Sequence, residues 1–142
     1  MKVLADTCAW SLALRRRNRA ALSDAERILV ASLGEAIKDG RIVLIGPIRQ
    51  EILSGIRDRS KFEGVRDRLR AFPDLEIETG DHEEAAAYYN RCRSKGIQGS
   101  FTDFVICAVA ARHELEIFTD DKDFLSYKSV LPIRLYGIQS SD

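Results

Sequence analysis

Short apolar runs alternate with longer stretches of helical periodicity along almost the whole of this 142-residue chain. Five segments predict short strands, and they lie at 2–5, 42–45, 75–79, 116–119 and 133–136. Strands separated by helices join most readily as parallel neighbours covered on both faces, and the uninterrupted apolar run at 42–45 fits such a strand. The sequence therefore predicts an α/β fold with a central, mostly parallel sheet flanked by helices. At this length a single domain over residues 1–142 is expected.

Helix-start and helix-stop signals separate the expected strands. Ser23 and Glu26 form a capping box, and Gly40 is a suitable stop for the helix that follows. Pro47 suits the first turn of a second helix. Further helices are expected at 60–72, from Asp81 to about Lys95, after Ser100 or Thr102, and at 121–127. Glu26 and Asp81 are interpreted as helix-start residues.

Composition excludes several classes of protein. Basic and acidic residues balance at 22 each, so the overall charge does not indicate a nucleic-acid-binding protein, and any such role must depend on local patches. The three cysteines show neither a zinc pattern nor an obvious disulfide framework, which favours a reducing compartment. No apolar run approaches the ~18 residues of a membrane span, and the N-terminus does not resemble a signal peptide. A cytoplasmic protein without membrane association is therefore expected.

Four acidic residues mark points at which strands or loops give way to helices. Asp6 follows the first strand, Asp121 follows the strand at 116–119, and Glu51 lies in the helix after the second strand. Asp103 opens a helix that follows a loop. Because open α/β sheets bind ligands outside the carboxyl ends of their strands, we expect the four side chains to share one pocket. Singly, each carboxylate also fits an ordinary role as a helix-start acid or a solvated side chain.

Clustered carboxylates repel one another, so protons or metal ions must hold them together. Oxygen ligands suit Mg²⁺ or Mn²⁺, which bind few protein groups and keep several waters. The two histidines, His82 and His113, have no neighbours that would complete a zinc site or a Ser–His–Asp triad. The sequence therefore predicts a site for Mg²⁺ or Mn²⁺.

Four ordered motifs give the chain a recognisable pattern. They are Val3-Leu4-Ala5-Asp6-Thr7, Glu51-Ile52-Leu53-Ser54-Gly55, Thr102-Asp103-Phe104-Val105-Ile106-Cys107-Ala108 and Phe118-Thr119-Asp120-Asp121-Lys122-Asp123-Phe124. In these motifs the chain resembles PIN-domain ribonucleases, specifically the VapC-type toxins of bacterial and archaeal toxin–antitoxin pairs. The resemblance implies a single PIN domain that cleaves RNA with a metal-activated water.

The resemblance also implies which residues form the site. The implied catalytic acids are Asp6, Glu51, Asp103 and Asp121, and the implied metal ligands are Asp6, Asp103, Asp121 and Asp123. Hydroxyl groups that support these acids are expected from Thr7, Ser100 and Thr102. The family pattern Thr–x–Asp–x–Asp–Phe favours Asp121 over its neighbour Asp120, although both acids follow the same strand. Either one or two metal ions are compatible with the sequence.

A basic cluster lies soon after Asp6. Its four arginines within five positions are Arg15, Arg16, Arg17 and Arg19. They are expected to bind RNA phosphates or the acidic residues of a protein partner, and the alternative is a solvated helix face. A second basic stretch, at 57–70, carries interleaved acids that favour ordinary surface pairing.

The function implied by the resemblance is that of a metal-dependent endoribonuclease, the toxin of a toxin–antitoxin pair. Its expected partners are an RNA substrate, a VapB-type antitoxin and a second copy of the chain in a homodimer. Two other hypotheses are open at this stage. A phospho-accepting receiver domain also has an acidic Mg²⁺ site, but it needs paired acids after the first strand, where Asp6 stands alone. The other is a catalytically inactive PIN fold used only for binding.

Overall fold

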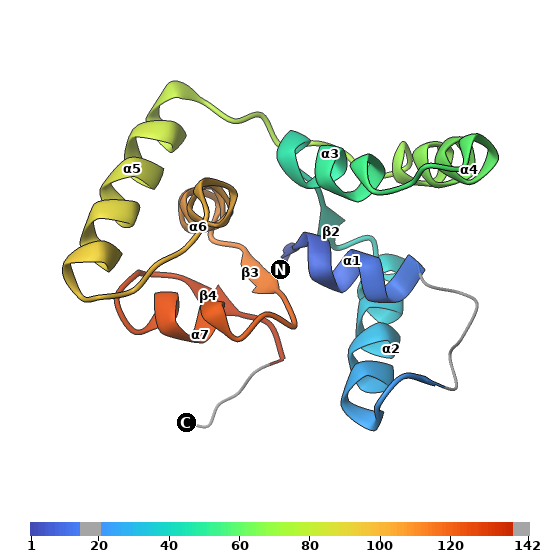
Figure 1. The fold of residues 1–142 in the computed structure, drawn as a ribbon, viewed down its shortest axis with the longest axis horizontal. Helices are drawn as coiled ribbons and strands as arrows, with labels where there is room; N and C mark the ends of the chain where they lie inside the picture. Colours follow the sequence, from blue (N-terminus) through green and yellow to red (C-terminus); the bar gives the residue numbers. More distant parts are fainter. Residues whose placement is uncertain (15–20, 138–142) are drawn as a thin grey trace.

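Four parallel strands form the centre of the molecule in a computed structural model that describes residues 1–14 and 21–137. The strands are β1 (Val3–Ala5), β2 (Ile42–Val43), β3 (Glu116–Phe118) and β4 (Arg134–Leu135), and their order across the sheet is β2-β1-β3-β4. The central strand β1 is completely buried, as its uniformly apolar sequence requires. The predicted α/β fold with a parallel sheet is confirmed (Figure 1).

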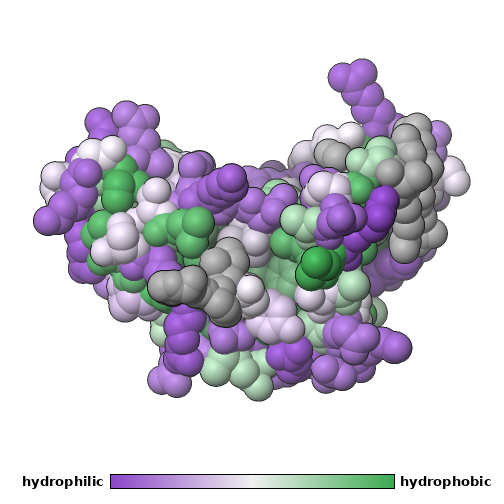
Figure 2. Space-filling model, turned by 90° about the horizontal axis from the view of Figure 1, so that it is seen from below, coloured by the Kyte–Doolittle hydropathy of each residue, from purple (hydrophilic) through white to green (hydrophobic). Residues whose placement is uncertain are grey.

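Helices surround the sheet, and the described residues contain seven of them. They are α1 (Thr7–Leu14), α2 (Asp24–Lys38), α3 (Gly46–Ser54), α4 (Arg59–Leu69), α5 (Thr79–Ser94), α6 (Phe101–His113) and α7 (Asp123–Lys128). The capping box predicted from Ser23 and Glu26 is present at the start of α2. No described helix combines the length and the apolar character needed to cross a membrane. On the face shown in Figure 2, hydrophilic side chains predominate and hydrophobic ones form small separate groups.

One predicted strand is wrong. Among the residues that the structure describes, the stretch at 75–79 pairs with no strand, and one isolated bridge between Leu44 and the preceding Asp74 links it to the sheet. The Leu75 N–H donates to the Leu44 carbonyl at 2.8 Å. The alternation that predicted a strand arises because Leu75 and Ile77 turn towards the core while the residues between them face solvent. An extended segment with one half-buried face therefore lies beside the edge of the sheet without continuing the ladder.

Helix α6 lies inside the molecule, with every residue from Phe104 to Ala110 buried. In Figure 1 it is seen end-on between α5 and the sheet. A bidentate ion pair ties it to α5, because Arg112 Nε and Nη2 lie 2.6 and 2.8 Å from the carboxylate oxygens of Asp81. Asp81 is only 2% exposed, and its hydrogen bond with Arg112 holds its pKa below the usual range. The interpretation of Asp81 as a helix-start residue is confirmed, because its carboxylate accepts the Glu78 N–H at 2.9 Å in a capping box, but it was incomplete, since Asp81 also pairs with Arg112.

The register of the sheet brings two distant segments to one edge. Ala5, the last residue of β1, pairs with Phe118, the last residue of β3. The chain leaves both strands side by side, and the Asp6 N–H donates to the Phe118 carbonyl at 3.0 Å. Asp6 and Thr119 consequently face each other at the carboxyl edge of the sheet, the place where open α/β sheets bind ligands.

Candidate active site

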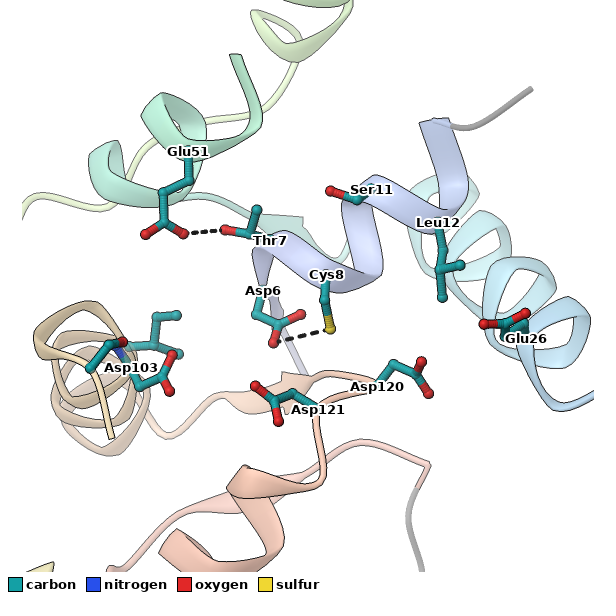
Figure 3. A pocket seen from close by; sticks show the side chains of 12 residues that line it. Asp6, Thr7, Cys8, Ser11, Leu12, Glu26, Glu51, Asp103, Asp120 and Asp121 are labelled. Atoms are coloured by element: carbon teal, nitrogen blue, oxygen red, sulfur yellow. Dashed lines mark hydrogen bonds between the residues drawn. The ribbon is translucent and has the colours of Figure 1, made fainter. Parts of the chain in front are cut away.

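A cleft of about 630 Å³ opens at the carboxyl edge of the sheet. Its walls come from α1, α3, the start of α6 and the loop after β3 (Figure 3). The structure brings four predicted acids from four separate segments to this cleft: Asp6, Glu51, Asp103 and Asp121. Thr7 and Ser100, two of the three predicted hydroxyl residues, also line it.

Asp6 is the deepest of the acids, with 5% of its surface exposed. Its Oδ1 accepts the Ala9 N–H at 3.0 Å, and its Oδ2 accepts the Thr119 hydroxyl at 2.5 Å. Burial raises the pKa of Asp6, and the nearby charge of Asp121 adds to that increase. An ionised carboxylate in this position is costly for the metal-free protein, and a bound cation would offset the cost.

Cys8 lies beside Asp6, and its thiol is within 3.6 Å of Asp6 Oδ2. Burial, together with the charge of Asp6, raises the pKa of the Cys8 thiol to about 12. The thiol therefore stays protonated near neutral pH and is unsuited to act as a nucleophile. Cys8 instead serves as a weak hydrogen-bond donor to the carboxylate.

Asp103 stands in the first turn of α6, where the Ser100 hydroxyl accepts the Asp103 N–H at 3.0 Å and caps the helix. Its Oδ2 accepts the hydroxyl of Tyr127 at 2.6 Å. Burial raises the pKa of Asp103, and the charge of Asp121 contributes to the same increase. Tyr127 is fully buried, and burial together with this hydrogen bond raises the pKa of its phenol far above the ordinary value. Tyr127 thus acts as a fixed donor that orients one carboxylate of the cleft.

Asp121 and Asp120 point in different directions from the loop after β3. In Figure 3 the Asp121 carboxylate is directed towards Asp6 and Asp103, whereas Asp120 is directed towards α2. Asp121 is held by two backbone hydrogen bonds, from its own N–H to Thr119 Oγ1 and from the Asp123 N–H to its Oδ1, both 2.9 Å. This geometry favours Asp121 as the site acid, although both residues line the cleft. 

Asp123, a predicted metal ligand, is exposed and is not among the lining residues of the cleft. Its contribution in this structure is the backbone N–H that it donates to Asp121. Its charge also raises the pKa of Asp103, but less than burial does. Direct metal ligation by Asp123 therefore stays a prediction.

Glu51 faces these aspartates from the opposite wall, on α3 (Figure 3). It is exposed, and its Oε1 accepts the Thr7 hydroxyl at 2.7 Å. Glu26 lines the same cleft at the start of α2. The sequence interpretation that Glu26 has only a capping role was therefore incomplete.

The sequence did not identify two hydroxyl residues that hold the acids. Thr119 donates to Asp6, and its position directly before the two aspartates in the last motif was a signal that could have identified it. Tyr127 is 24 positions from Asp103, and nothing local in the sequence points to it. Thr102, which was predicted, does not line the cleft. The basic cluster of Arg15, Arg16, Arg17 and Arg19 lies outside the described residues, so its role stays a prediction.

The donor set of the cleft suits a hard divalent cation, because it consists of carboxylate oxygens with raised pKa values at two of them. Within residues 1–14 and 21–137, no three His, Cys, Asp or Glu side chains are arranged to hold a metal ion as they stand. The chemistry of the residues therefore fits Mg²⁺ or Mn²⁺, whereas their present side-chain positions do not define a coordination sphere.

Comparison with known proteins places this chain in a family. The family model described as "PIN domain" matches residues 3–129. The chain is 31% identical over 124 residues to "Ribonuclease VapC11" of Mycobacterium tuberculosis, and the match covers 86% of this chain and 88% of that protein. The same figures apply to "VapC ribonuclease Mb1587" of Mycobacterium bovis.

Solved structures show the same fold. The crystal structure of FitAcB from Neisseria gonorrhoeae matches with a TM-score of 0.66 at 18% identity, covering 95% of this chain and 96% of that one. The structure of FitAB bound to an IR36 DNA fragment matches with a TM-score of 0.67 at 15% identity, covering 99% of both chains. The chain therefore belongs to the PIN-domain family. Within that family it is related to the VapC ribonucleases.

Proposed function

We propose that this protein is a Mg²⁺- or Mn²⁺-dependent endoribonuclease that acts as the toxin of a toxin–antitoxin pair. The observation that carries the proposal is the cleft itself, where carboxylates from four segments of the chain meet at the carboxyl edge of the sheet. Relatedness to VapC ribonucleases over most of the chain supports RNA as the substrate. The receiver hypothesis loses its support because the chain belongs to the PIN-domain family.

In the proposed mechanism, Asp6, Asp103 and Asp121 would hold the metal. When bound, the metal would make a water easier to deprotonate and would neutralise charge growing on the phosphate. The residues of the chain fix the carboxylates in advance, since the Thr119 and Tyr127 hydroxyls donate to two of them. Preorganised ligands bind a metal without first losing side-chain freedom.

Glu51 has a different environment and is assigned a different role. It is exposed on the opposite wall, and one of its oxygens is engaged by Thr7 at 2.7 Å. That bond fixes the direction of the carboxylate while leaving the other oxygen available. We assign Glu51 to orienting the attacking water or accepting its proton.

The proposal includes the partners expected of a VapC-type toxin. They are a VapB-type antitoxin and a second copy of the chain in a homodimer, and the setting is the cytoplasm. The relation to VapC ribonucleases supports these partners. The similarity in fold to chains of the FitAB complexes agrees with a partner-bound form. The PIN-domain match over residues 3–129 supports a single domain.

Cleavage of RNA by the purified protein tests the activity. Mn²⁺ should permit cleavage, EDTA should abolish it, and Asp6→Asn should remove most of it while the protein stays folded. A folded protein that cuts no RNA with either Mg²⁺ or Mn²⁺ would instead support the inactive PIN fold used for binding.

Growth of a bacterial host tests the biological role. Induction of the protein alone should arrest growth, and either Asp6→Asn or co-expression of the antitoxin should relieve the arrest. Undiminished arrest by Asp6→Asn would show that toxicity does not arise from metal-dependent cleavage.

A further inference from the structure

The acidic cleft has two neighbouring hollows, which are linked to it through shared lining residues. It shares Ser11 and Glu51 with a hollow of about 220 Å³ between α1, α3 and α4. That hollow also contains Lys61, and it shares Ile56 with a third hollow of about 350 Å³. The three hollows therefore adjoin one another in a row, called the groove below, from the carboxylates, past Lys61, to the turn between α3 and α4.

The far end of this groove is basic. The third hollow is lined by three arginines among its six residues, Arg57, Arg59 and Arg66. Residues 56–70 carry six basic and three acidic side chains, a net charge of +3, whereas the whole chain has a net charge of zero. The local excess of positive charge lies on the α4 side of the cleft.

Counting partners among the described residues alone, some of these cations are paired and others are not. Arg59 forms an ion pair with Glu63 at 3.3 Å, and Arg66 forms one with Asp67 at 3.0 Å. Within the described part of the chain, neither the Arg57 nor the Lys61 side chain has an ion pair or a hydrogen bond. Arg57 and Lys61 are both exposed and both line the groove, so they are the cations available to an incoming anion.

The opposite end of the cleft has the opposite charge. Glu26 and Asp120 line it on the α2 side, beyond the central acids (Figure 3). A polyanion would be repelled there and attracted towards α4. Phe62, which is half-buried, adds an aromatic surface beside the arginines. Basic side chains combined with an aromatic ring are the usual composition of sites for single-stranded nucleic acid.

We propose that single-stranded RNA leaves the acidic cleft on one side only, along the groove between α1 and α3 and onto the α3–α4 turn. Arg57 and Lys61 neutralise phosphates of the nucleotides that flank the cut on that side. This inference rests on the proposed function, because it supplies a path for the RNA of that same site. The surface pairing predicted for the basic stretch at 57–70 is present at Arg59, Arg66 and Arg70, and the proposal adds a role for Arg57 and Lys61.

Binding of a fluorescein-labelled single-stranded RNA of mixed sequence tests the path. The protein carries Asp6→Asn to prevent cleavage, and the Kd is measured at several salt concentrations. The double change Arg57→Glu with Lys61→Glu should weaken binding about tenfold or more at low salt and lower the slope of log Kd against log salt by about 1–2. Arg134→Glu is the control, since Arg134 pairs with the first residue of β3 at the amino end of the sheet. The control should bind as the parent does.

A second measurement uses the cleaving protein and does not depend on the folding of the double variant. RNAs shortened from one end or the other, relative to the cut, are compared by kcat/KM. Shortening one flank should lower kcat/KM, and shortening the other should leave it unchanged. Equal losses from both ends would overturn the one-sided path.

Three outcomes separate the inference from the function on which it rests. Unchanged RNA affinity and salt slope in a folded double variant would overturn the path while leaving the ribonuclease in place. A double variant that binds RNA normally but loses an acidic protein partner would also overturn it, because the groove would then be a protein-docking surface. Failure of the parent protein to cut any RNA with Mn²⁺ would contradict the proposed function itself.

Discussion

Replacing Tyr127 with Phe would remove a single hydroxyl from the candidate site. Tyr127 is fully buried in α7, and its hydroxyl donates to Asp103 Oδ2 at 2.6 Å. Its ring lies 5.0 Å, between centroids, from the rings of Phe104 and Phe124, and those contacts survive the substitution. Tyr127→Phe therefore tests the hydrogen bond with little change in packing.

The expected cost follows from that geometry. A hydrogen bond to a charged group contributes about 1.5–3 kcal/mol, and the lower end applies because Asp103 is partly exposed. A loss of ~1.5 kcal/mol lowers the melting temperature of a domain of this size by about 3–6 °C. Loss of the bond that orients the Asp103 carboxylate should weaken Mn²⁺ binding about tenfold, as is typical when a metal ligand loses its supporting partner.

Two measurements report the effects of Tyr127→Phe. Thermal melting in EDTA reports the cost to the fold, and calorimetric titration with Mn²⁺ reports the cost to the metal site. The hydrogen bond from Tyr127 lowers the pKa of Asp103, so its removal should shift Mn²⁺ binding to higher pH. Tyr88→Phe is the matched control, because Tyr88 is also buried but lies on α5 and does not line the cleft. It should lower stability without changing Mn²⁺ affinity.

Unchanged Mn²⁺ affinity in Tyr127→Phe would refute the orienting role, provided that Asp103→Asn loses the metal in the same assay. An equal loss of Mn²⁺ affinity in Tyr88→Phe would refute it as well, because the effect would then arise from general loosening of the fold.

Three further substitutions give distinct signatures. Gly99→Ala places a Cβ against the hydroxyl and ring of Tyr127. It should lower the free energy of unfolding in urea by about 1–3 kcal/mol and weaken Mn²⁺ binding in calorimetry. An unchanged free energy of unfolding would contradict the close packing. Asp81→Asn removes the buried charge of a half-buried ion pair and should lower the melting temperature by several degrees without changing the metal affinity of the folded protein. Because burial raises the pKa of Asp103 in the folded state, its contribution to stability is complete at low pH and is lost as the pH rises through that pKa. Urea unfolding in EDTA between about pH 4 and about pH 7 should therefore show a smaller decline for Asp103→Asn than for the parent, and identical declines would contradict the assigned burial.

Sequence patterns predicted the parts of the fold that depend on local signals. An apolar run followed directly by Asp6 located β1 and the acid at its end, and the pair Ser23 and Glu26 located the start of α2. Parallel pairing followed from the alternation of strands and helices. Because the carboxyl ends of such strands share an edge, the meeting of the acids could also be expected.

Features that depend on tertiary packing were not accessible in the same way. Leu75 and Ile77 alternate with polar residues as a strand would, yet the segment meets the sheet edge only through one isolated bridge. Asp81 has the sequence position of a helix-start acid, and its partner Arg112 lies 31 residues away. Tyr127 reaches Asp103 only because α6 and α7 pack together. A local sequence pattern does not show which distant residues pair in the fold.

The adjacent residues Asp120 and Asp121 permit the most direct test of the proposed metal-dependent site. Both are acids and both line the cleft, but only Asp121 is directed towards Asp6 and Asp103. The measurement is the rate of RNA cleavage in Mn²⁺ by the parent, Asp120→Asn and Asp121→Asn, with folding checked by thermal melting. Asp121→Asn should lose most activity, and Asp120→Asn should retain it. Loss in Asp120→Asn with activity kept in Asp121→Asn, or full activity in both, would contradict the site described.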